Sequence, residues 1–154
     1  MQEAERNQVK LISLDMSSRE IPDKDTLRRL IEVFHTAQKP ILIHDLSGAD
    51  RAGEASALYE LVVMHKPKSE ALKMLNWRFH HFDYFRPAKR YFIELFQSEE
   101  WALNEYDPCS GKYRYYDTNN IKCRAVLPTS SSPAAKPSCT NDAGGPLSET
   151  PQCR

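Results

Sequence analysis

The sequence has no excess of charge of either sign, because 21 lysine and arginine residues balance 21 aspartate and glutamate residues. This balance excludes a bulk attraction to nucleic acid or to an anionic membrane, so any bound anion must be held by a local site. No apolar run approaches the roughly 20 residues of a membrane-spanning helix, and the polar N-terminus does not resemble a signal peptide. We therefore expect a cytoplasmic protein with no nucleic-acid partner and no membrane span.

The sequence also lacks closely spaced cysteines. The four that it has are Cys109, Cys123, Cys139 and Cys153, and none forms the paired spacing of a zinc site. We expect free thiols, since nothing else in the sequence indicates an oxidising compartment. From residue 128 onward large apolar side chains are almost missing, so that segment cannot offset its ordering entropy. The sequence predicts one domain over residues 1–106 and a flexible, partly disordered tail over residues 107–154.

Two short apolar runs, residues 9–14 and 41–44, are typical of buried strands. Apolar residues at helical spacing predict helices from about residue 23 to 38, from 51 to 65, from 69 to 77 and from 87 to 96. Asp23 is suited to cap the first of these helices. Strands alternating with helices indicate an α/β fold. Two strands cannot cover these helices, so we expect further strands of the domain to lie upstream.

A glycine-containing loop joins the second predicted strand to the second predicted helix. Its residues are Leu46, Ser47, Gly48, Ala49, Asp50 and Arg51. Amides at the start of a helix point toward an anion, and the helix dipole adds positive potential. Gly48 gives the turn conformational freedom, and the planar fork of Arg51 can bind two phosphate oxygens. The loop therefore predicts a phosphate-binding site.

The same residues resemble a known family. Lys39-Pro40-Ile41-Leu42-Ile43-His44 followed by Ser47-Gly48-Ala49-Asp50-Arg51-Ala52-Gly53 is similar to the loop of bacterial dual-specificity and protein-tyrosine phosphatases. The likeness extends over roughly residues 11–96. It implies a three-layer sandwich around a mostly parallel sheet, no metal or cofactor, and a phosphorylated protein or small phosphoester as ligand. Asp45 stands where the family has its nucleophilic cysteine, in register with Arg51.

This substitution alters the expected chemistry. The family cysteine attacks phosphorus as a thiolate, whereas a carboxylate is a poor nucleophile and repels an entering phosphate dianion. Enzymes that form an aspartyl phosphate use magnesium and further acidic ligands, and here only Asp50 is near in sequence. We therefore expect a phosphatase-like protein without activity, in which Asp45 can itself fill the anion site. The alternatives are a phosphatase whose unaltered form acts through a phosphocysteine, and a fragment without independent function.

Other site residues follow from the resemblance or from local pattern. Asp15, after the first predicted strand, is the candidate general acid, and the resemblance implies that His44 orients the loop. We interpret His80 and His81 as an ordinary pair with one buried and one exposed ring. Helical spacing favours a core position for most aromatic residues between positions 77 and 92.

Overall fold

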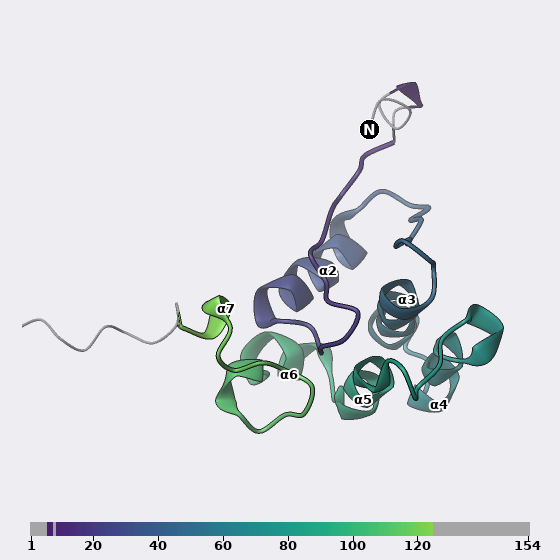
Figure 1. Cartoon of the computed structure of the whole chain (residues 1–154). Coiled ribbons are helices and arrows are strands. Elements are labelled where there is room, and N and C mark those ends of the chain that lie inside the picture. Colours follow the sequence, from purple (N-terminus) through teal and green to yellow (C-terminus); the bar gives the residue numbers. More distant parts are fainter. Residues whose placement is uncertain (1–5, 8, 125–154) are drawn as a thin grey trace, which may run out of the picture.

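The structure, a computed structural model, describes residues 6, 7 and 9–124. Within this range it contains six labelled α-helices and three short 3-10 helices. The α-helices are α2 (Lys24–Thr36), α3 (Asp50–Val62), α4 (Lys68–Ala71), α5 (Pro87–Leu95), α6 (Glu99–Asn104) and α7 (Ile121–Arg124). The 3-10 helices are η1 (Leu72–Met74), η2 (Trp77–Phe79) and η3 (Pro108–Ser110). Figure 1 shows α3 between α2 and the pair formed by α4 and α5, while α6 packs beside α2.

The predicted α/β sandwich is wrong for this part of the chain, because the described residues form no strand and no sheet. Residues 9–14 and 41–44 are extended, but neither segment makes a backbone–backbone hydrogen bond within the described range. A strand is stable only beside another strand. The helices bury their apolar faces against one another instead. Leu42 is left 85% exposed and Leu11 52% exposed.

The segment from residue 9 to 16 keeps the side-chain alternation of a strand without its pairing. Ile12, Leu14 and Met16 turn inward, and the last two pack against the core. Leu11 and Ser13, which alternate with them along the chain, face outward. Alternation follows from an extended backbone alone, so it does not require a sheet.

Three of the predicted helices are confirmed. Asp23 caps α2 by accepting from the Thr26 amide at 2.9 Å, and the predicted stripe from Leu27 to Phe34 is buried. Helix α5 begins at Pro87, whose missing N–H costs nothing in a first turn. The third predicted helix is wrong in extent, because residues 69–77 break into α4, η1 and the start of η2. Helix α6, capped by the Ser98 hydroxyl, was missed.

Helix α3 is buried on nearly all sides. Its small residues let α4, α5 and η1 approach closely, and a Cβ at Gly53 would lie 3.0 Å from the Met74 carbonyl oxygen. Glu54 and Lys89 form an ion pair of 2.8 Å between α3 and α5, with both side chains fully buried. Lys89 also donates to the Glu20 carbonyl at 2.7 Å. This pair therefore joins the central helix to α5 and to the chain that precedes α2.

Residues 107–124 pack against the helical body. The Ile21 amide donates to the Tyr115 carbonyl at 2.9 Å, and Lys122 bonds the Asp23 carboxylate at 2.7 Å. Cys109 and Cys123 form a disulfide across 14 residues, so the expectation of free thiols is wrong for these two. Cys139, Cys153 and the predicted disordered tail beyond residue 124 lie outside the described residues. None of the helices in the described range has the length and apolar character needed to cross a bilayer.

The buried Glu54 gives stability a specific dependence on pH. Burial raises the pKa of Glu54 to about 7, although the nearby Lys89 charge opposes the rise. Between its usual pKa and about 7, the folded protein binds a proton that the unfolded chain does not. We therefore expect stability to fall, by an amount on the order of a few kcal/mol, as pH rises through this window. Urea unfolding at several pH values should show this component in the wild type and not in Glu54→Gln.

Reduction of the disulfide should lower stability. A cross-link that closes a loop of about 15 residues contributes about 3 kcal/mol through the unfolded chain. Urea unfolding with and without dithiothreitol measures the loss. A chain with Cys139→Ser and Cys153→Ser should retain the full effect, whereas Cys109→Ser should abolish it. An unchanged midpoint on reduction of the wild type would contradict the pairing of Cys109 with Cys123.

Candidate anion-binding loop

The Asp45 side chain occupies the centre of the loop that was predicted to bind phosphate. Its Oδ1 accepts from the Ser47 amide at 2.9 Å and from the Gly48 amide. Its Oδ2 accepts from the Arg51 amide at 3.0 Å and from the Ala52 amide at 3.2 Å. One oxygen therefore binds the loop, and the other binds the first turn of α3. The side chain is only 6% exposed.

Local backbone geometry produces this arrangement. Gly48 has φ of 72°, a left-handed conformation that glycine adopts without the strain of a side chain. The turn directs the Ser47 and Gly48 amides back toward residue 45. Helix α3 starts at Asp50, so the amides of its first turn have no helical partner and also face this point. Four amides converge on the carboxylate as they would on a bound anion.

The surroundings favour the charged form of Asp45. Burial acts to raise the pKa of Asp45, but the amides of Gly48, Ala52 and Ser47 and the charge of Arg51 together hold it below its usual range. A carboxylate that accepts several amide hydrogen bonds is stabilised as an anion. The loop therefore has a resident negative charge where a ligand phosphate would carry its own.

Arg51 lies beside this carboxylate without being fully used by it. Its Nε is 3.5 Å from Asp45 Oδ2, close enough for an ion pair but without hydrogen-bond geometry. The terminal guanidinium nitrogens make no hydrogen bond within the described part of the chain, and the side chain is 34% exposed. The planar fork that suits phosphate oxygens is thus available.

Other predicted loop residues are brought to the site only in part. Leu46 and His44 point into solvent, with Leu46 95% exposed, and the His44 ring has no hydrogen-bond partner among the described residues. Ala49 is buried at the start of α3. The loop-orienting role of His44 stays a prediction that no contact supports.

A network of polar side chains that the sequence did not reveal contacts the loop through Asp50. His81 is 2% exposed, and its two ring nitrogens lie 2.8 Å from Asp50 and 3.0 Å from Asp83. Arg86 Nε lies 3.5 Å from the other Asp50 oxygen, and Arg90 bonds Asp83 at 2.7 Å. The interpretation of one buried and one exposed histidine is confirmed, since His80 is exposed. The contact of His81 with Asp50, 31 residues away in the sequence, had no sequence signal.

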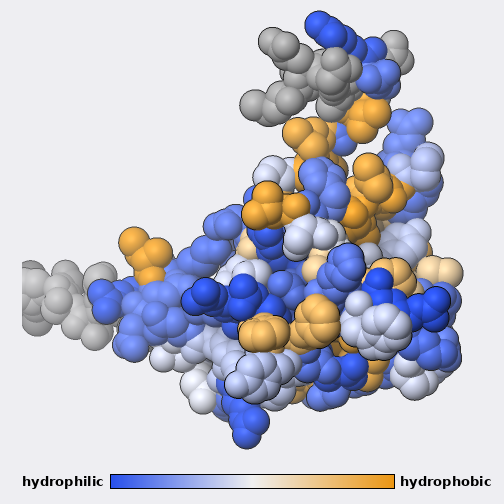
Figure 2. Space-filling model, turned by 45° about the vertical axis from the view of Figure 1, so that its right-hand side comes forward, coloured by the Kyte–Doolittle hydropathy of each residue, from blue (hydrophilic) through white to orange (hydrophobic). Residues whose placement is uncertain are grey.

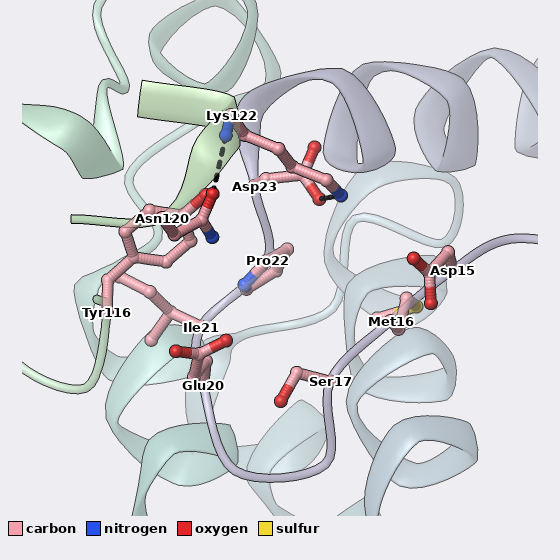
Figure 3. Close-up of a pocket in the computed structure, with 10 residues that line it drawn as sticks. All are labelled: Asp15, Met16, Ser17, Glu20, Ile21, Pro22, Asp23, Tyr116, Asn120 and Lys122. Atoms are coloured by element: carbon pink, nitrogen blue, oxygen red, sulfur yellow. Dashed lines mark hydrogen bonds and ion pairs between the residues drawn. The ribbon is translucent and has the colours of Figure 1, made fainter. Parts of the chain in front are cut away.

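Asp15, the predicted general acid, lies at a different site. It lines a cleft of about 190 Å³ beside the N-terminus of α2, together with Glu20, Asp23 and Lys122, and no residue of the loop lines this cleft. Figure 3 shows Asp15 and Tyr116 at opposite edges of the residues that line this cleft, with the Asp23–Lys122 pair between them. The Asp15 backbone carbonyl accepts from the Thr26 hydroxyl at 3.2 Å, which fixes this position. The structure does not bring Asp15 and Asp45 together.

A smaller cleft of about 130 Å³ does adjoin the loop. It is lined by Ile43 and Gly48, by small residues of α3, and by Met74 and Phe79. Within the described range, no group of three or more histidine, cysteine or carboxylate side chains could hold a metal ion. Comparisons of the chain with protein-family models, with curated proteins and with solved structures found no match.

The contacts of Asp45 predict its contribution to stability. Asp45→Asn removes the charge and offers the four amides one acceptor oxygen, so we expect a loss of about 1–3 kcal/mol at neutral pH. Because the pKa of Asp45 is lowered in the folded protein, its stabilisation is present above the usual pKa and is lost as pH falls through the lowered value. Urea unfolding at neutral pH and in acid tests both points. Asp15→Asn, which replaces a carboxylate that accepts no amide, should change little.

Proposed function

We propose that this chain is a phosphatase-related protein that has no phosphatase activity and whose anion-binding loop is occupied by its own Asp45. The observation that carries this proposal is the set of four amide hydrogen bonds to the Asp45 carboxylate. A phosphate in such a loop would accept hydrogen bonds from the same amides. The support is the loop sequence and its geometry, not the overall fold and not the comparisons.

Two features argue against turnover. The position of the nucleophile carries a carboxylate whose lone pairs are engaged by amides, so it cannot attack phosphorus without giving up those bonds. The predicted general acid, Asp15, lines another cleft, and a leaving oxygen at the loop has no proton donor from it. In the described loop, Arg51 keeps its terminal guanidinium nitrogens free for an external anion.

The ligand class follows from the loop. A phosphorylated protein or a small phosphoester can bind only by displacing the Asp45 carboxylate, since two anions a few Å apart repel strongly in a poorly solvated site. We propose weak or no phosphate binding in the wild type. A cytoplasmic location belongs to the same proposal, and the Cys109–Cys123 disulfide weighs against it, because such bonds are rare in reducing compartments.

The proposal predicts that removing the Asp45 side chain opens the loop. Asp45→Ala should bind inorganic phosphate or tungstate at least about tenfold more tightly than the wild type, a change of about 1.4 kcal/mol. Isothermal titration calorimetry and the ligand-induced shift in melting temperature measure this gain. Adding Arg51→Ala to the Asp45→Ala chain should remove most of it, and Asp15→Ala should leave the wild-type behaviour unchanged.

The same proteins can be assayed for hydrolysis of para-nitrophenyl phosphate with vanadate as the inhibitor control. The wild type should show no turnover, and measurable vanadate-sensitive turnover would overturn the proposal. Asp45→Cys tests the alternative of a phosphatase that acts through a phosphocysteine. Activity in that variant alone would show that residue 45 silences an otherwise competent site. A folded but inactive Cys variant would place the defect in the missing acid as well.

A further inference from the structure

Residues 77–85 expose an unusual concentration of aromatic side chains. The exposed fractions are 72% for Trp77, 49% for Phe79, 51% for Phe82, 91% for Tyr84 and 66% for Phe85. The expectation that most of these rings belong to the core is therefore wrong for this stretch, although Phe92 in α5 is fully buried. Large apolar rings gathered on a surface indicate an interaction site. We call these five residues the aromatic patch.

The stretch that carries the patch is attached to the helical body through a buried histidine. His81 is the one residue of the stretch that is buried, and it bonds both Asp50 at the start of α3 and Asp83. His80 has φ of 58°, so the chain turns sharply after η2 and leaves the rings on the outside. Phe85 makes edge contacts with Phe82 and Tyr84, with ring centroids 6.5 Å and 5.2 Å apart. These contacts join three of the five rings of the patch.

One exposed cation, Arg78, lies within the stretch, directly after Trp77 in the sequence. The exposed His80 follows Phe79. Asp83 is the only carboxylate between residues 76 and 86, and it is bonded by both His81 and Arg90. Figure 2, which turns this side of the molecule toward the viewer, shows hydrophobic side chains among strongly hydrophilic ones. An apolar surface interleaved with cations is complementary to an anionic, amphipathic partner.

We propose that the aromatic patch binds an anionic lipid surface. Tryptophan and tyrosine prefer the headgroup region of a bilayer, where the ring is apolar and its polar atom stays hydrated. Cations near the surface are attracted to anionic lipids. Of the five rings, Phe79 lines the smaller of the two clefts described above. The phenylalanines enter the acyl boundary while Arg78 contacts lipid phosphates.

This inference does not rest on the loop at Asp45. The patch shares no hydrogen bond with the Asp45 carboxylate, and its link to α3 runs through His81 and Asp50. The wild type, whose loop amides are occupied by the Asp45 carboxylate, is therefore the protein in which vesicle binding is tested. Failure of the proposed loop function and failure of lipid binding are separately detectable.

The first experiment is flotation of the full chain with vesicles of phosphatidylcholine alone or with phosphatidylserine added. We expect binding only to the anionic vesicles. Arg78→Ala should weaken binding about fivefold, the factor for removing one cation near the surface, and a chain with Trp77→Ser and Phe85→Ser should lose it. Arg28→Ala and Leu42→Ser change an exposed cation and an exposed apolar residue elsewhere. Both controls should bind as the wild type does.

Tryptophan fluorescence gives a second, site-specific measurement. The chain has two tryptophans, and Trp101 is 5% exposed whereas Trp77 is largely in water. Anionic vesicles should therefore shift the emission to the blue through Trp77. Trp77→Phe should still bind but lose the shift.

Absence of vesicle binding would overturn the proposal, as would equal losses in the two controls. A dimer that requires the patch in size-exclusion chromatography and does not bind vesicles would also overturn the proposal. That result would assign the patch to protein contact.

Discussion

Helix α3 is buried on nearly all sides, and the polar groups that it carries into the interior constrain its surroundings. Glu54 requires the charge of Lys89, which places α5 against α3 and brings the Glu20 carbonyl to the same ammonium group. At the N-terminus of α3, the free amides require an acceptor, and Asp45 supplies it. Asp50 then fixes the histidine beneath the aromatic patch. The core, the loop and the patch all depend on the same helix.

Local signals were sufficient for the helices that begin with a cap and bury one stripe. Asp23 and the stripe of α2 act through neighbours within a few residues, which a sequence displays directly. The two expected strands failed for the opposite reason, because a strand depends on partners elsewhere in the chain. Residues 9–16 bury alternate side chains, yet they have no sheet to join. Short capped helices such as α6 are hard to detect because six residues carry little periodicity.

The centre of the site was foreseeable, and its periphery was not. Spacing along the chain placed Asp45, Gly48 and Arg51 in one turn, and the structure brings all three together. Asp15 was assigned as the general acid because it follows an expected strand. No sheet forms in the described part of the chain, and Asp15 lines a cleft away from the loop. His81 joins Asp50 over a distance of 31 residues, and nothing in residue type or spacing announces such a bond. Long-range polar contacts of this kind are specified only by the finished packing.

The covalent attachment of Asp45 has a consequence for any free anion. The Asp45 carboxylate is tethered to the loop whose amides bind it. It competes with a dissolved anion for those amides at an effective concentration of about millimolar or above, set by the short chain that joins them. Dissolved phosphate at lower concentration meets a loop that behaves as already saturated. An external ligand gains entry only with contacts beyond the loop, and Arg51 and the cleft next to Phe79 are where such contacts are available. Under the proposed function, the loop is therefore insensitive to simple phosphate and admits only ligands that make these further contacts.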